Sequence, residues 1–175
     1  MFLKMELLQN DTLEEKMPKK MTAWGVGRRL LLISLLYLAL TIILHFSRPD
    51  IFTITQISYL VSAILGIILI VVGLVIWVLG ARIIRNAFHE GRLLTNGVYA
   101  IVRNPMYSGL IVFVSPGIAL LFRSWLMLTM PFVAYIVFML LIKTEAIYLE
   151  EKFGQEYLDY KLKVNSLIPF PRFLK

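Results

Sequence analysis

Long apolar stretches alternate with short polar segments along this chain. Four stretches carry no Asp, Glu, Lys or Arg, and they cover residues 30–46, 57–80, 107–122 and 125–142. At about 1.5 Å per residue the first two reach roughly 25 and 36 Å, comparable with a hydrocarbon core of about 30 Å. The pattern predicts an all-α, polytopic integral membrane protein with about four transmembrane helices.

Only Arg123 and Ser124 separate the last two stretches, which we expect to form a tight C-terminal helical hairpin. In the second stretch Gly66, Gly73 and Gly80 recur every seven residues. Small residues at this spacing form one flat stripe, so they predict close packing of another helix; cofactor contact is the alternative.

Composition and charge narrow the class further. The chain has 175 residues, 59% of them apolar, and a net charge of +7 without any cysteine. Its mean hydropathy is +0.78, which excludes an ordinary soluble domain. The basic residues fall between apolar runs and not in one cluster, so we expect no nucleic-acid partner.

The Lys and Arg residues predict the orientation. Six lie in residues 1–29, four in 81–106 and six in 143–175. The positive-inside rule places these segments, and with them both termini and several cytoplasmic helices, on the cytoplasmic side. We expect residues 1–29 to be a cytoplasmic or interfacial leader and not a removable signal peptide. Residues 30–175 then form one domain, with the cell membrane as the expected location.

One polar segment combines residue types suited to anion binding. Arg103, Asn104 and Pro105 precede the third apolar stretch, and proline suits the first turn of a helix. The N–H groups of that helix start, with the forked guanidinium of Arg103, favour a carboxylate or phosphate. The alternative is structural: Arg103 snorkels, Asn104 caps the helix, and Tyr99 and Tyr107 belong to an aromatic belt.

A second polar segment follows the fourth stretch. Glu145 shares a helix face with Leu149 and Phe153, which makes it the acid nearest the bilayer. Gly154 is expected to end this helix. A further helix is predicted from the stripe Tyr157, Tyr160 and Val164. The structural alternative for Glu145 is an ion pair with Arg103, Arg85 or Lys143.

Several chemistries find no support in the sequence. The apolar stretches lack the ionisable residues that pumps and proton-coupled transporters need. His45 and His89 are the only histidines and have no zinc-ligand spacing, so we expect no metal. A glycine-rich dinucleotide fingerprint after a strand is also absent.

Two blocks together resemble a known superfamily. They are Gly97-Val-Tyr-Ala-Ile-Val-Arg-Asn-Pro-Met-Tyr-Ser-Gly109 and Glu145-Ala-Ile-Tyr-Leu-Glu-Glu-Lys-Phe-Gly-Gln-Glu-Tyr-Leu-Asp-Tyr160. They are similar to the integral-membrane methyltransferases of the isoprenylcysteine carboxyl methyltransferase and phospholipid methyltransferase superfamily. The resemblance covers about residues 57–171.

This resemblance implies S-adenosyl-L-methionine as the methyl donor. Arg103 and Glu145 would be the catalytic residues, with Glu145 holding the cofactor's amino group or ribose. Asn104 replaces a histidine of the isoprenylcysteine type, and Ala146 replaces a second acid. The implied cofactor-binding residues are Tyr99, Arg103, Asn104, Pro105, Tyr107, Gly109 and Glu145.

The resemblance also implies a lipid or lipid-modified substrate in the bilayer, methylated on a carboxylate or on an amine. The resemblance leaves two alternatives open. One is a membrane isoprenoid or sterol double-bond reductase, which resembles the same helical core. The other is a non-enzymatic assembly or transport subunit, for which loss of Arg103 or Glu145 would affect no cofactor binding.

Overall fold

The structure is a computed structural model that describes residues 27–90 and 92–168, with the backbone alone for 85–90. The predicted leader, residues 1–29, lies almost entirely outside this part. The described chain is helical and contains no strand, which confirms the predicted fold class. The elements are α2 (Gly27–Ser47), α3 (Pro49–Phe52), α4 (Tyr59–Glu90), the 3-10 turn η1 (Gly97–Ala100), α5 (Pro105–Ser108), the π-helical segment η2 (Gly109–Val114), α6 (Ser115–Leu121), the 3-10 turn η3 (Met127–Thr129), α7 (Met130–Phe153) and α8 (Gln155–Lys163).

Within the described residues, three helical segments are long and apolar enough to cross a membrane: Gly27–Ser47, Tyr59–Ile84 and Met127–Phe153. The fourth predicted span forms a shorter apolar helix, Pro105–Leu121, built from α5, η2 and α6. Both α4 and α7 continue past their apolar stretches into the polar segments. At the end of the molecule that carries α8, α4 and α7 therefore extend well beyond the short helix.

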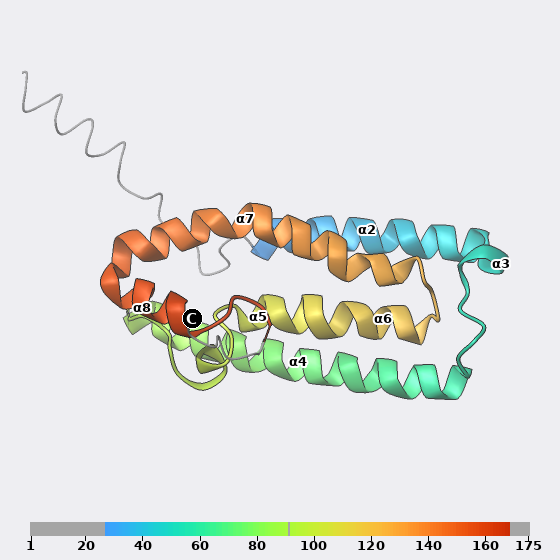
Figure 1. Cartoon of the computed structure of the whole chain (residues 1–175), viewed down its shortest axis with the longest axis horizontal. Helices are drawn as coiled ribbons and strands as arrows, with labels where there is room; N and C mark the ends of the chain where they lie inside the picture. The colour runs from blue at the N-terminus through green and yellow to red at the C-terminus, as the bar shows by residue number, and fades with distance from the viewer. Residues whose placement is uncertain (1–26, 91, 169–175) are drawn as a thin grey trace, which may run out of the picture.

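The helices form two layers (Figure 1). In one layer α2 packs against α7, and in the other α4 packs against α5, η2 and α6. The predicted glycine stripe explains the second contact. A Cβ atom at Gly66 would lie 2.7 Å from the carbonyl oxygen of Gly117, and one at Gly73 would lie 2.5 Å from that of Gly109. Only hydrogen fits at these positions, so the packing interpretation of the stripe is confirmed.

The predicted hairpin is also confirmed. The helix that ends with α6 stops at Leu121, and η3 begins at Met127. Arg123 adopts a φ of 49°, a left-handed conformation that reverses the chain direction. The amide of buried Ser124 then donates to the carbonyl of Ala119 over 2.9 Å. The turn holds α6 and α7 antiparallel.

Gly154 ends α7 with a φ of 54°, as its position in the sequence predicts. The predicted second helix follows as α8, and it turns Tyr157 and Tyr160 inward, where both are buried. After α8 the chain, residues 164–168, runs back beneath α7 toward the start of α5 (Figure 1). The two polar segments of the sequence meet at this point.

Candidate active site

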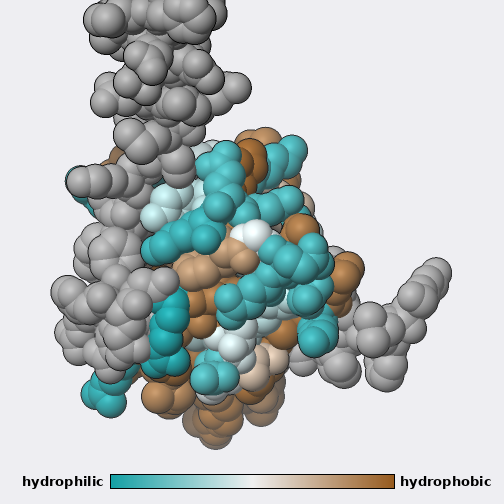
Figure 2. Space-filling view, turned by 90° about the vertical axis from the view of Figure 1, so that its left-hand side faces the viewer, coloured by the Kyte–Doolittle hydropathy of each residue, from teal (hydrophilic) through white to brown (hydrophobic). Residues whose placement is uncertain are grey.

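A cavity of about 1340 Å³ is lined by residues of both helix layers and reaches the α8 end of the molecule. Figure 2 shows that end, where hydrophilic side chains surround an apolar centre. Residues of α2, α4, η1, α5, η2, α6, α7 and α8 line the cavity, together with residues 92–94, 103–104 and 165–168. Its lining is polar near α8 and apolar further between the helices.

The 164–168 segment is hydrogen-bonded to the start of α5. The amide of Arg103 donates to the carbonyl of Asn165 over 2.8 Å, and the amide of Asn104 donates to that of Ser166 over 3.1 Å. The hydroxyl of Ser108 donates to the carbonyl of Leu167 over 2.6 Å. Leu167 is buried in an apolar cluster, so this segment is a fixed wall of the cavity.

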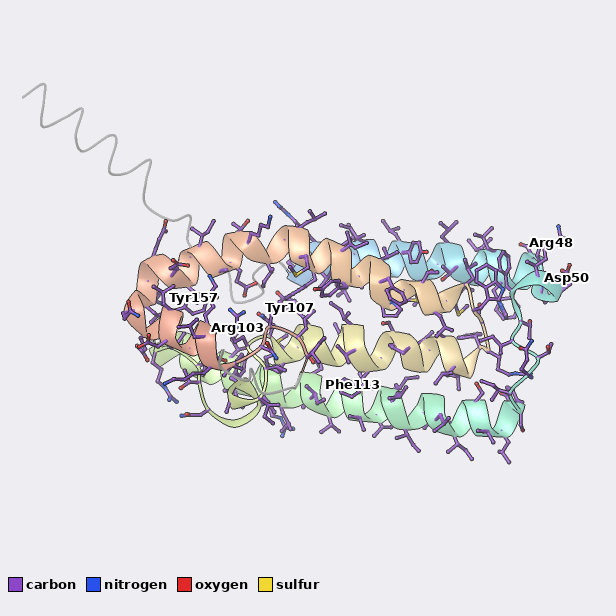
Figure 3. All side chains as sticks on the ribbon, in the orientation of Figure 1. Arg48, Asp50, Arg103, Tyr107, Phe113 and Tyr157 are labelled. Carbon is purple, nitrogen blue, oxygen red and sulfur yellow. The ribbon has the colours of Figure 1, made fainter. Side chains whose placement is uncertain are left out.

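Arg103 is held from two sides. Its Nε donates to the carbonyl oxygen of Val164 over 3.0 Å, and its Nη1 donates to the hydroxyl of Tyr157 over 3.4 Å. Figure 3 shows Arg103 and Tyr157 close together at the α8 end. The half-buried guanidinium is therefore held against the protein at the cavity wall, which differs from the snorkelling alternative.

Asn104 occupies the N-cap position of α5 but its side chain makes no capping hydrogen bond. The capping alternative is wrong because the amide is engaged elsewhere. Nδ2 donates to the Oγ of Ser166 over 2.9 Å and to its carbonyl over 3.3 Å. Asn104 thus joins the start of α5 to the 164–168 segment.

Tyr107 connects α5 to α7 across the cavity. Its hydroxyl donates to the Oε2 of Glu145 over 3.4 Å. Its ring packs on that of Phe138, with the centroids 5.4 Å apart. Glu145 is half-buried and lines the cavity, so the acid predicted to lie nearest the bilayer faces the same space as Arg103.

Tyr99 is buried below the cavity and bonds to α4 through its hydroxyl, which donates to the carbonyl of Gly80 over 3.4 Å. Tyr160 donates in turn to the carbonyl of Tyr99. Burial raises the pKa of Tyr99 above its usual range, and neighbouring Tyr160 and Glu145 raise it further. Burial also raises the pKa of Tyr160, although Arg103 partly offsets the effect. Both hydroxyls stay protonated at neutral pH and act as donors.

The cavity brings most of the sequence-predicted site residues together: Tyr99, Arg103, Asn104, Pro105, Tyr107 and Glu145. Gly109 lies elsewhere, buried against Gly73 of α4 and away from the described cavity lining. The role of Gly109 is in packing, because a residue without a side chain at this position lets the short helix approach α4.

Sequence reasoning missed two side-chain partners of these residues, Ser166 and Tyr157, and also the bond from Ser108 to Leu167. The bonds of Ser166 and Ser108 join segments about sixty residues apart, so no local pattern indicates them. Tyr157 is part of the second block and of the predicted stripe, but neither feature indicates that it meets Arg103.

The charged residues that line the cavity are mostly basic. Glu145 is the one acid among the described lining residues. A positively charged part of a ligand would therefore pair with Glu145, whereas an anionic part could pair with any of several basic side chains. The basic residues are Arg28, Arg92, Arg103, Lys143, Lys152 and Lys161.

Comparison with known proteins gives consistent similarities. A family model described as phospholipid methyltransferase matches residues 61–156, more than half of the chain. A probable protein-S-isoprenylcysteine O-methyltransferase of Oryza sativa subsp. indica is 28% identical over 122 residues, which cover 65% of this chain and 64% of that protein. Protein-S-isoprenylcysteine O-methyltransferase B of Arabidopsis thaliana is 33% identical over 87 residues, which cover 50% of this chain and 44% of that protein. The matches span less than two thirds of these relatives' lengths, and no solved structure matches the chain.

Proposed function

Because this chain belongs to the phospholipid methyltransferase family, we propose that it transfers a methyl group from S-adenosyl-L-methionine to an acceptor held in the membrane. One observation carries the proposal. Two blocks about forty residues apart meet at one cavity, where Arg103 and Tyr107 come from the first block and Glu145 and Tyr157 from the second.

The residues at the polar end of the cavity fit this cofactor. The cofactor carries a carboxylate, an ammonium group and a sulfonium, and the site offers a guanidinium and a carboxylate that face one space. Arg103 would hold the carboxylate, and Glu145 would hold the ammonium group or the ribose. The remaining contacts would come from Tyr99, Asn104, Pro105 and Tyr107, with Gly109 placing the helix that carries Tyr107.

The cofactor supplies an electrophilic methyl group bound to sulfur. Arg103 and Glu145 contribute orientation, and the apolar lining excludes water from the acceptor. A carboxylate acceptor needs no base, because it is already an anion. An amine acceptor has to lose a proton, and either Glu145 or bulk water would receive it.

The apolar part of the cavity suits a lipid or lipid-modified acceptor. Leu31 and Leu35 of α2 and Leu74 of α4 line the cavity, yet each is about half exposed. Such side chains mark a side that stands open to the bilayer in a membrane. A lipid tail would enter between α2 and α4, while the cofactor enters at the α8 end.

The charge distribution supports a cytoplasmic position for the α8 end and for both chain termini in a multi-pass protein of the cell membrane. The relatives named as isoprenylcysteine O-methyltransferases favour a prenylated carboxylate, and the family model favours a phospholipid amine. The two acceptors differ in the product, since a methyl ester is base-labile and a methylated amine is not.

Methyl transfer from labelled S-adenosyl-L-methionine, in membranes that contain the protein, tests the proposal. Lipid-extractable label that depends on Glu145 is expected, and mild base then identifies the acceptor group. The variant is Glu145→Gln, and the matched control is Glu151→Gln, an exposed acid of the same helix.

Loss of label in Glu145→Gln but not in Glu151→Gln would support the proposal. Equal label in empty membranes would contradict methyl transfer. Absence of saturable cofactor binding to the purified protein would favour the non-enzymatic alternative. Oxidation of a nicotinamide cofactor with an unsaturated lipid would favour the reductase.

A further inference from the structure

The two hydrogen bonds of Arg103 come from the same part of the fold. Tyr157 lies in α8, and Val164 follows directly after that helix. The accepting atoms are the Tyr157 hydroxyl, at 3.4 Å from Nη1, and the Val164 carbonyl oxygen, at 3.0 Å from Nε. The orientation of the guanidinium therefore depends on the placement of α8.

The pattern of bonds restricts how Arg103 binds a ligand. A guanidinium has five N–H donors, which form two edges suited to a carboxylate: Nε with Nη2, and Nη1 with Nη2. The bond to Val164 engages the single N–H of Nε. A carboxylate therefore cannot form a bidentate contact with the first edge. The second edge uses one N–H of Nη1 and one of Nη2, and Nη1 has a further N–H that can bond to Tyr157 at the same time.

Tyr157 is well suited to fix this edge. It is 4% exposed, and its helix is anchored by Tyr160, which donates to the carbonyl of Tyr99. Burial raises the pKa of Tyr157, while the nearby guanidinium of Arg103 lowers it in part. The hydroxyl stays neutral, so it accepts from Arg103 without neutralising the positive charge that an anionic ligand needs.

We infer that Tyr157 is a positioning residue that directs the Nη1–Nη2 edge of Arg103 at the carboxylate of the cofactor. This inference rests on the proposed function. It goes beyond that function because it assigns a role to a residue of α8 and fixes which edge of the guanidinium binds. Because Tyr157 belongs to α8, the affinity for the cofactor would depend on the packing of that helix.

The test compares two ligands that differ only in the carboxylate: S-adenosylhomocysteine and its decarboxylated analogue. Titration calorimetry of the purified full chain gives the ratio of the two affinities. We expect Tyr157→Phe to lower this ratio about threefold to tenfold, the usual net size of one hydrogen bond. The matched control is Tyr37→Phe, which removes a half-buried hydroxyl of α2 that bonds to Thr129 outside the cavity, and it should keep the ratio of the wild type.

If Tyr157 has a purely structural role, Tyr157→Phe should lower the affinity for both ligands equally and leave the ratio unchanged. This result would overturn the inference. A double-mutant cycle gives a second readout. Arg103→Lys removes the fork, so adding Tyr157→Phe to it should lower the ratio no further. Additive losses would also overturn the inference.

The failure of the proposed function has a different signature in this experiment. If the wild-type protein binds neither ligand, the methyltransferase proposal fails and the inference fails with it. If the wild-type protein binds both ligands equally well, the cofactor site stands, and the contact between Arg103 and the carboxylate is refuted.

Discussion

Gly73 is the position at which the contact between α4 and the short helix is most sensitive to substitution. A Cβ atom added there would lie 2.5 Å from the carbonyl oxygen of Gly109, 2.8 Å from Cγ2 of Val114 and 2.9 Å from Cβ of Phe113. Two of these atoms belong to groups that cannot rotate away. The Gly73→Ala variant can form only if the two helices move apart.

Two opposing free-energy terms decide the effect of Gly73→Ala. Overpacking a tight contact costs about 1–3 kcal/mol, and three short contacts place this site near the upper value. Alanine gains about 1 kcal/mol over glycine in a helix. The net loss in the free energy of unfolding is about 2 kcal/mol. At roughly 2–4 °C per kcal/mol for a chain of this size, the melting temperature should fall by about 4–8 °C.

Gly80→Ala is the internal control for this calculation. A Cβ atom at Gly80 would meet Cγ of Met106 at 3.1 Å and Cγ of Pro105 at 3.2 Å. The methionine side chain can move, so the gain in helix propensity should offset the contact. Thermal unfolding of the three proteins in one detergent measures the difference. A Gly73→Ala variant as stable as Gly80→Ala would refute the reasoning, because the short helix would then not be in van der Waals contact with α4.

Two further predictions concern the polar end. Asn104→Leu should lower the free energy of unfolding by about 2 kcal/mol and speed proteolysis after α8, because it removes both side-chain bonds to Ser166 and leaves only the backbone amide of residue 104 bonded to the Ser166 carbonyl. Unchanged proteolysis would contradict this anchoring role. The contribution of Tyr99 and Tyr160 to stability should be constant between about pH 8 and 10 and fall above about pH 10. The reason is that the pKa values of both hydroxyls are raised in the folded state, so the unfolded chain releases these protons first. Melting temperatures between about pH 8 and 11 test this prediction, and Tyr160→Phe should show a shallower fall than the wild type.

The features that follow from local pattern were predictable from the sequence. The apolar stretches, the hairpin turn at Arg123 and the end of α7 at Gly154 all appear where the sequence places them. Each depends on neighbouring residues alone: hydropathy, a left-handed turn, and a glycine after a helix. The gathering of Tyr99, Arg103, Tyr107 and Glu145 at one cavity also agrees with the two-block resemblance.

The features that the sequence could not predict depend on contacts between distant segments. Asn104 is a good N-cap residue by local criteria, yet its amide binds Ser166 because the 164–168 segment lies within reach. Gly109 belongs to the same block as Arg103, but the helix turns it toward α4 and away from the cavity. A residue pattern gives the chemical types of a site, whereas the direction of each side chain is decided by tertiary packing.

The position of the cavity follows from the unequal lengths of the helices. At about 1.5 Å per residue, α7 with its 24 residues is roughly 36 Å long, while the helix Pro105–Leu121 reaches only about 25 Å. The hairpin aligns these two helices at the α3 end, so the difference of about 10 Å appears at the α8 end, where α4 also extends further (Figure 1). The shorter helix leaves a recess, and Arg103, two residues before that helix, lines it. Extending α5 by one turn would fill the recess, so the proline at the first position of α5 sets the depth of the site as well as the start of the helix.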